Sequence, residues 1–164
     1  MKKGQLLEQP FVFIFAIVVI GLIFLFGFYI VRNLVSLGDN VDLRVLVNNL
    51  ESKVKECKNL DFGSVCDLSK ITFSSIRVVC FIDPDSEFSI SRIPSGFIKS
   101  NVNRTLSSKR YNVYFEPLPD KRLNQNYVFI SDIRPNTNPL CQNVIGSRLR
   151  LFLENKGDYV EVRQ

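Results

Sequence analysis

The most extended pattern in this chain is an apolar run close to its N-terminus. Residues 11–31 include no charged side chain and no proline. At about 1.5 Å rise per residue, a helix of this length can cross a hydrocarbon core of about 30 Å. A helix on the surface of a small soluble domain keeps a polar stripe, and this run has none. The pattern therefore predicts a transmembrane helix over residues 10–37, with Pro10 in its first turn.

A second helical pattern follows, with apolar residues at intervals of three and four and polar residues between them. This spacing places the apolar side chains on one helix face, which is typical of a helix that packs against a sheet. Gly38 suits a helix C-terminus, and Asp39 or Asn40 suits the N-cap of a new helix. We expect an amphipathic helix over residues 41–57, either separate or a kinked continuation of the first. Its apolar positions are Leu43, Leu46, Val47, Leu50, Val54 and Cys57.

From about residue 70 the apolar positions recur with a period of two, which is typical of strands. A turn of sequence Asn155-Lys156-Gly157-Asp158 joins the last two expected strands into a hairpin. Residues 117–126 and 132–139 have the composition of exposed loops. No helical pattern separates the strands, so the sheet is expected to be mostly antiparallel. The expected strands are 76–82, 111–115, 127–130, 148–153 and 159–162, with a further short one at 88–93.

These patterns predict an α+β chain in which a long transmembrane helix and an amphipathic helix precede a mostly antiparallel β-sheet domain. Its divisions are a cytoplasmic segment at 1–9, the transmembrane helix at 10–37 and an extracytoplasmic α+β domain at 38–164. Lys2 and Lys3 precede the apolar run, and basic residues favour the cytoplasmic side of a membrane. We therefore expect a single-pass protein in contact with membrane lipid, with its N-terminus in the cytoplasm.

Composition argues against several classes of function. The chain has no histidine, so the commonest general base and metal ligand is missing, and we expect neither an enzyme nor a bound cofactor. A net charge of +5 without a dense basic stripe argues against nucleic-acid binding. Asp83, Asp85 and Glu87 cluster after a strand, but they lack the spacing and glycine of a calcium-binding loop. We expect a solvated turn there and no metal site.

The four cysteines are candidates for disulfides, because an even number in an extracytoplasmic domain suggests pairing. Cys57 and Cys66 bracket a short polar loop, which favours a local bridge. Cys80 lies in an expected strand and Cys141 follows a proline-rich loop, so a long-range bridge could join them. Other pairings, and four buried free thiols, remain the alternatives.

Asn103-Arg104-Thr105 forms a glycosylation sequon in the part of the chain that is expected to be extracytoplasmic. Asn103 is therefore a candidate modification site, although such triplets also arise by chance. We expect this stretch to be an exposed loop.

The first residues carry one resemblance to a known family. Lys2-Lys3-Gly4-Gln5, then Glu8 and the apolar run, resembles the class III signal peptide of archaeal type IV pilin-like proteins. The family pattern is Lys-Gly-Gln-x-Ser-x-Glu; here Leu7 stands where serine is usual, and Glu8 comes one residue early. The resemblance implies that a prepilin peptidase cuts between Gly4 and Gln5.

The resemblance also implies a fold and a role. Cutting after Gly4 removes Lys2 and Lys3, which frees the helix to pack with the helices of other copies in a filament. In the family, the early glutamate is thought to meet the N-terminal amine of a neighbouring subunit, and Glu8 is the candidate here. The expected function is a structural pilin-like subunit of a cell-surface filament. The alternatives are a monomeric membrane-anchored extracytoplasmic binding domain and an accessory component of an envelope or secretion complex.

Overall fold

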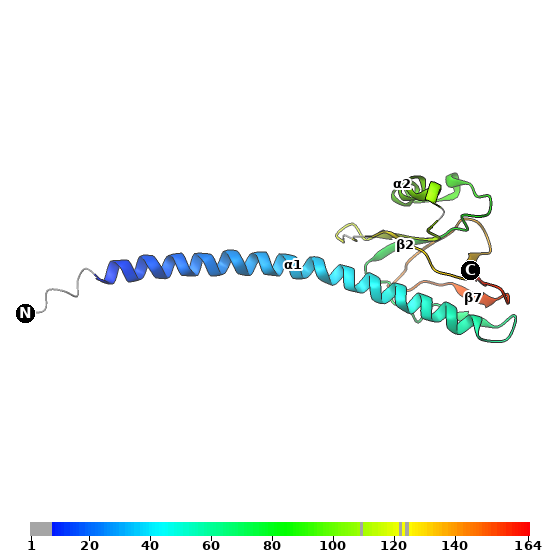
Figure 1. Cartoon of the computed structure of the whole chain (residues 1–164), viewed down its shortest axis with the longest axis horizontal. Coiled ribbons are helices and arrows are strands. Elements are labelled where there is room, and N and C mark those ends of the chain that lie inside the picture. The colour runs from blue at the N-terminus through cyan, green and yellow to red at the C-terminus, as the bar shows by residue number, and fades with distance from the viewer. Residues whose placement is uncertain (1–7, 109, 122, 124) are drawn as a thin grey trace, which may run out of the picture. The chain divides into compact units, whose positions relative to one another are not determined.

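The computed structural model describes residues 8–108, 110–121, 123 and 125–164, and its account of side chains does not extend to 8–11, 33–42 and 106. The chain divides into two compact units, Met1–Gly38 and Asp39–Gln164. The elements are coloured along the chain in Figure 1. In chain order they are α1 (Glu8–Lys58), β1 (Val65–Asp67), β2 (Ile76–Phe81), η1 (Ile90–Arg92), α2 (Gly96–Thr105), η2 (Leu106–Ser108), β3 (Val113–Pro117), β4 (Tyr127–Val128), β5 (Ile133–Pro135), β6 (Leu140–Asn143), β7 (Phe152–Asn155) and β8 (Val160–Arg163).

Helix α1 begins at Glu8 and ends at Lys58 without a break. Of the two alternatives, a separate helix after Gly38 and a continuation of the first helix, the structure has the continuation. A single glycine inside a helix costs about 1 kcal/mol relative to alanine. That cost is too small to end a helix when good helical sequence lies on both sides.

Two four-stranded sheets belong to the Asp39–Gln164 unit. One has the strand order β1-β7-β8-β5 and the other the order β4-β3-β2-β6. All neighbouring strands are antiparallel except β5 and β8, which are parallel. The predicted α+β class with mostly antiparallel sheets is thus confirmed. The expected hairpin is also present: β7 pairs with β8, and its turn contains Gly157 at a φ of 84°, which glycine adopts without strain.

The larger core lies where the second part of α1 meets the two sheets. Leu50 and Cys57 of α1 are fully buried there, as are Val79 of β2 and Leu153 of β7. The helix face that packs into this core is the one that the sequence predicts. It consists of Leu43, Leu46, Leu50, Val54 and Cys57, with Val47 partly buried beside them.

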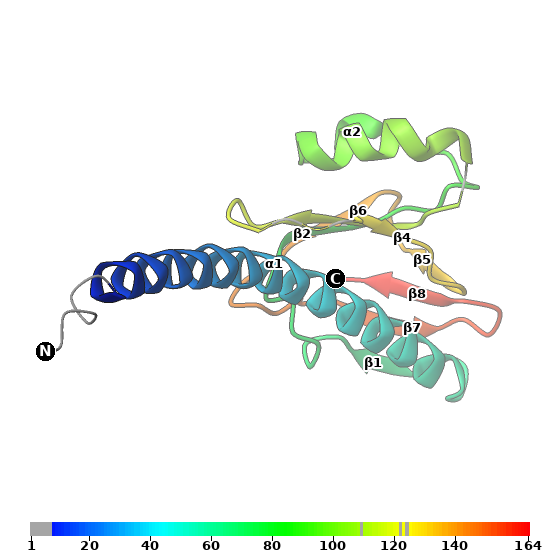
Figure 2. The same cartoon turned by 60° about the vertical axis from the view of Figure 1, so that its left-hand side comes forward.

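A second, smaller core lies on the other face of the β4-β3-β2-β6 sheet, which α2 covers (Figure 2). Ile98 and Val102 of α2 pack there against Val78 and Cys80 of β2. Strand β2 is therefore buried on both faces. This explains why its sequence lacks the alternation of apolar and polar residues that a strand buried on one face would show.

Several segment predictions are wrong. Residues 88–93 form no strand; they include the short 3-10 helix η1, closed by a hydrogen bond of 3.2 Å from Ile93 N to Ile90 O. Residues 132–139 are not simply a loop, because they contain β5. The strand expected over 148–153 begins only at Phe152. Helix α2 and the strands β1 and β6 are additional elements that the sequence pattern did not indicate.

Two disulfides link elements within the Asp39–Gln164 unit. Cys57–Cys66 joins the end of α1 to β1, and Cys80–Cys141 joins β2 to β6, where the two cysteines are cross-strand partners. These are the two pairings that the positions of the cysteines favour. Each bridge restricts the unfolded chain, and such bridges typically contribute about 2–4 kcal/mol to stability.

Leu50→Ala is expected to lower the free energy of unfolding by about 2–5 kcal/mol, because it leaves a cavity in the larger core. Val45→Ala is the matched control on the same helix, since Val45 is 51% exposed. Its effect should stay within about 0.5 kcal/mol. Denaturant titration of the full chain in detergent micelles, followed by circular dichroism, measures both. Equal effects of the two substitutions would contradict the position of this helix face in the core.

Because all four cysteines are bridged, we expect the denatured full chain to take up no maleimide label in the absence of reductant. After reduction it should take up four labels, as counted by intact mass. In Cys66→Ala, peptide mapping should find one reactive thiol, at Cys57, with Cys80 and Cys141 still protected. A label on Cys80 or Cys141 in that variant would show a different pairing, and four labels in the denatured, unreduced wild-type chain would show that no bridge forms.

Candidate functional site

The segment Val12–Arg32 of α1 could span a membrane by its length and composition, and it is the one such helix among the residues that the structure describes. Its mean hydropathy is 3.0, and none of it is buried within the protein. Phe13, Phe15 and Phe24, for example, are each about 70% exposed. Keeping apolar surface in water costs about 25 cal/mol per Å², so a surface of this size needs lipid or protein around it.

The residues expected to take part in processing and assembly stand before this segment. Gly4 and Gln5 lie outside the described residues, and Glu8 is the first residue of α1, with its side chain outside the description. Cleavage after Gly4 and a pairing role for Glu8 therefore stay predictions.

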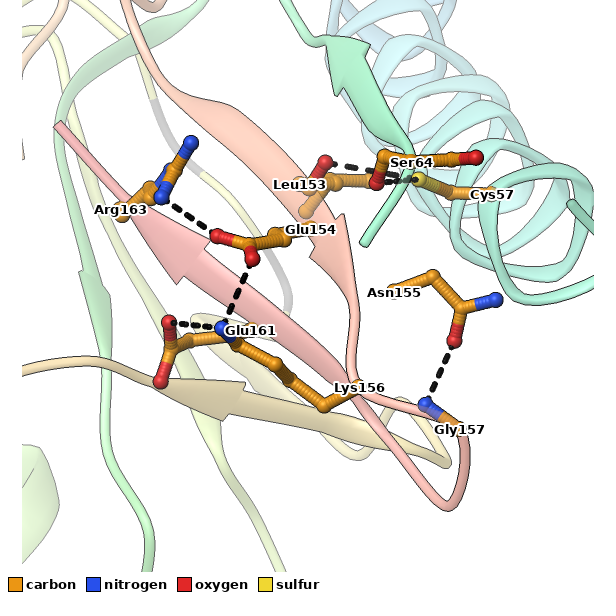
Figure 3. A network of polar contacts seen from close by, with 9 residues as sticks. All are labelled: Cys57, Ser64, Leu153, Glu154, Asn155, Lys156, Gly157, Glu161 and Arg163. Carbon is orange, nitrogen blue, oxygen red and sulfur yellow. Dashed lines mark hydrogen bonds and ion pairs between the residues drawn. The ribbon is translucent and has the colours of Figure 1, made fainter. Parts of the chain in front are cut away.

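Asn155 holds the end of α1 to the β7–β8 hairpin. Its contact with Gly157 in the turn is drawn in Figure 3. Its side-chain amide donates to the carbonyl oxygens of Lys58, at 3.0 Å, and Leu60, at 2.7 Å. Its Oδ1 accepts a hydrogen bond of 2.8 Å from the backbone N–H of Gly157. The side chain thus satisfies the last carbonyl group of the helix, that of Lys58, and the carbonyl group of Leu60 just beyond the helix. Sequence analysis assigned Asn155 only to the turn and missed this role.

The sulfur of Cys57 lies within the same region, 3.4 Å from the carbonyl oxygen of Leu153 and 4.0 Å from that of Ser64 (Figure 3). Because Cys57 is bridged to Cys66, its sulfur carries no proton and donates no hydrogen bond. The two distances therefore describe packing of the disulfide against the backbone of β7 and of the loop before β1. The bridge and Asn155 act on the same end of the helix.

Charged side chains form a connected group on β7, β8 and their turn (Figure 3). Lys156 Nζ donates to Glu154 Oε1 at 2.7 Å and lies 3.7 Å from Glu161, and Arg163 also pairs with Glu154. The hydrogen bond from Lys156 lowers the pKa of Glu154, and the same bond raises the pKa of Lys156. Both groups thus keep their charges near neutral pH. Surface pairs of this kind contribute little to the free energy of unfolding. We interpret this group as contacts within the β7–β8 hairpin and assign it no further role.

A surface hollow of about 340 Å³ is lined by residues from β2, β3 and β6 and by the two residues before α2. Arg77 and Glu116 form an ion pair in it. Glu116 is only 8% exposed, whereas the side chain of Arg77 is 54% exposed. Glu116 Oε2 has no hydrogen-bond partner among the described residues. Sequence analysis missed this pair, although a glutamate directly after the buried Val113-Tyr114-Phe115 run was a usable signal.

The acidic stretch after β2 is a turn in which the carboxylate oxygens of Asp83 accept hydrogen bonds from residues of the same turn. The carboxylate of Asp83 accepts hydrogen bonds from Asp85 N at 3.1 Å and from Ser86 Oγ at 2.8 Å. Asn138 bonds both the N–H and the C=O of Asp83, at 3.0 and 2.8 Å. Within the described part of the chain, no group of three or more His, Cys, Asp or Glu residues could hold a metal ion.

Asn103 lies on α2 and is exposed, so the prediction of a loop around the sequon is wrong. Thr105, the third residue of the sequon, is buried at the end of the helix, and its hydroxyl meets that of Tyr114 at 2.8 Å. Modification of Asn103 stays a prediction.

No protein-family model, curated protein or solved structure matches this chain. The function of the chain is therefore inferred from its own residues and their geometry. The Val12–Arg32 segment constrains that function most, because none of it is buried among the residues that the structure describes.

Proposed function

We propose that this chain is a structural subunit of the archaeal type IV pilin-like kind. Its apolar helix is first held in the membrane and then packs with the helices of other copies in a cell-surface filament. The observation that carries this proposal is the Val12–Arg32 segment, which is apolar on every face and unburied within the protein. A helix of that kind suits lipid before assembly and a helical bundle after it.

In this proposal, cleavage of the N-terminal segment lets the helix move from the lipid into the helical bundle. Moving a lysine to the centre of a bilayer costs about 2.5–3.5 kcal/mol or more, so Lys2 and Lys3 hold the helix in the membrane. Cutting between Gly4 and Gln5 removes both lysines and leaves a new amine at Gln5. Glu8 then stays as the one charged side chain beside an apolar helix, and the amine of a neighbouring copy is a partner that neutralises it.

The Asp39–Gln164 unit supports an extracytoplasmic location for the folded domain. Its two disulfides are typical of proteins outside the reducing cytosol. Lys2 and Lys3 on the other side of the apolar segment favour the same orientation. An anchored monomer would share both features, so the processed N-terminus and assembly distinguish the filament subunit from it.

We expect the mature chain to begin at Gln5 when it is expressed in an archaeal host with a prepilin peptidase. Intact-mass measurement of the chain purified from membranes tests this. Gly4→Leu should keep Lys2 and Lys3, because the small residue before the cut is lost. Leu7→Ser restores the family pattern and is the matched control, which should be cut at least as completely. A wild-type chain that keeps both lysines would contradict the filament proposal and favour the uncut anchor.

Glu8→Ala is expected to reduce the filament fraction by more than about tenfold, because the amine of the neighbouring copy would lose its charged partner in an apolar setting. Membrane insertion should stay unchanged, as measured by resistance to carbonate extraction. Gln9→Ala is the matched control and should still assemble. Filaments are counted by electron microscopy of sheared cell-surface material. Equal filament yields from Glu8→Ala and Gln9→Ala would remove the assembly role of Glu8.

A further inference from the structure

Residues 88–115, which run from the end of the acidic turn into β3, carry charge of one sign only. They include five basic residues and no aspartate or glutamate. Arg92, Arg104 and Arg110 are exposed, and Lys99 is half-buried. None of these four takes part in an ion pair with another described residue, whereas the basic residues that do pair belong to α1, β2 and the β7–β8 hairpin. This stretch is therefore a basic surface that lacks its own counter-charge.

Helix α2 carries part of this charge on the side that faces away from the sheet it covers (Figure 2). Its buried residues pack in the smaller core. Lys99 and Arg104 lie among its other positions, together with Phe97, which is 41% exposed. We call these three residues, with Arg92 before the helix and Arg110 after it, the outer face of α2. A surface that combines cations with an aromatic ring and has no carboxylate suits an acidic partner.

A hollow of opposite charge lies in the same unit, where the turn after β2 meets β5 and the β7–β8 turn. Its volume is about 170 Å³, which exceeds the roughly 30 Å³ that one water occupies in the liquid. The end of a basic side chain therefore has room to enter. Its charged and aromatic lining, which defines the acidic hollow, includes Asp83, Asp85, Asp132, Arg134, Asp158 and Tyr159.

The acidic hollow already receives two basic groups of its own chain. Lys58 Nζ lies 2.9 Å from Asp132 Oδ1, and the guanidinium carbon of Arg134 lies 5.0 Å from the centre of the Tyr159 ring. These are the two common ways in which proteins bind a cation, by a carboxylate and by an aromatic face. Four aspartates still outnumber the two cations, and Asp158 is exposed without an ion pair to another described residue. The hollow can therefore accept further basic side chains.

We propose that the outer face of α2 docks onto the acidic hollow of a second copy of this chain. The two surfaces have opposite charge, and no ion pair of Arg92, Lys99, Arg104 or Arg110 joins them within one chain. Each copy thus offers its helix to one neighbour and its hollow to another. A contact between two different surfaces continues from copy to copy unless the copies close into a ring.

The contact adds a second interface to the proposed function, on which it rests, because assembly through the apolar helices brings the folded units together. Exposed ion pairs are weak one by one. Complementary charge mainly selects the partner surface and the orientation in which it docks. In this proposal, the apolar helices hold the copies together, and the outer face of α2 with the acidic hollow fixes how their folded units are oriented.

Carbodiimide crosslinking tests the contact, because this reagent joins a lysine amine to a carboxylate only when the two groups touch. The full chain is treated in membranes and in sheared surface filaments of the archaeal host. Mass spectrometry of the dimer band from a reducing, denaturing gel should find Lys99 joined to an aspartate of the acidic hollow. Lys99→Arg is the matched control, since it keeps the charge without an amine, and it should lose this link and still assemble. Lys53 pairs with Glu56 on its own helix, so it should link within one chain.

Charge reversal provides a second measurement. Lys99→Glu combined with Arg104→Glu should lower the filament yield about tenfold or more, because like charges then face each other across the contact. Asp158→Lys should lower it in the same direction, and the three substitutions together should restore most of the yield. Arg44→Glu combined with Arg150→Glu makes the same change in net charge at exposed positions outside both surfaces, and it should assemble as the wild type does. Circular dichroism checks that each variant is folded.

The outcomes separate this contact from the proposed function. Filaments without a link from Lys99 to the hollow of another copy overturn the contact and leave the filament proposal standing. Equal yields from the reversed and control variants, or a link from Lys99 only to another protein of the host, also overturn it. A link between copies in membranes that form no filaments supports the contact and contradicts the filament. The absence of both the link and the filaments contradicts both.

Discussion

The folded unit depends on how the end of α1 is bonded to the β7–β8 hairpin. Asn155 is 3% exposed and connects the carbonyl groups of Lys58 and Leu60 to the hairpin turn at Gly157. The Cys57–Cys66 bridge fixes the same helix turn to β1. The last carbonyl groups of a helix need partners from outside it, and Asn155 supplies one for Lys58. The face of the helix that enters the larger core follows from the spacing of its apolar residues from Leu43 to Cys57.

A second constraint follows from the burial of β2 on both faces. Val79 packs into the core shared with α1, and Cys80 packs under α2. A helix of ten residues covers about 15 Å of the sheet. Ile98 and Val102 of α2 pack on Val78 and Cys80, so this face of the strand is closed as well. The hollow that contains Arg77 and Glu116 lies beside the start of α2, where Pro94 and Ser95 line it.

Features that depend on near neighbours could be predicted from the sequence. The apolar run, the helix face from Leu43 to Cys57 and the hairpin around Gly157 all have strong local patterns. Helix α2 has a weaker pattern, because its packing rests on two apolar residues, Ile98 and Val102, that meet β2 from far along the chain. Strand β5 is short and includes Pro135, and its pairing is parallel. A glutamate directly after a buried run is a local signal for Glu116, but its partner Arg77 and the bonds of Asn155 connect distant residues, which no local pattern indicates.

The two units differ in what they still need from outside. The Asp39–Gln164 unit buries its apolar residues in two cores of its own and closes its cysteines in two bridges. None of the Val12–Arg32 segment is buried among the described residues, and the proposed function covers its large apolar surface first with lipid and then with other copies. Removing Lys2 and Lys3 would change which of these two environments the helix prefers without altering either core. In the proposed function, anchoring and assembly are therefore controlled at the N-terminus, while the two cores and the two bridges of the folded unit stay unchanged.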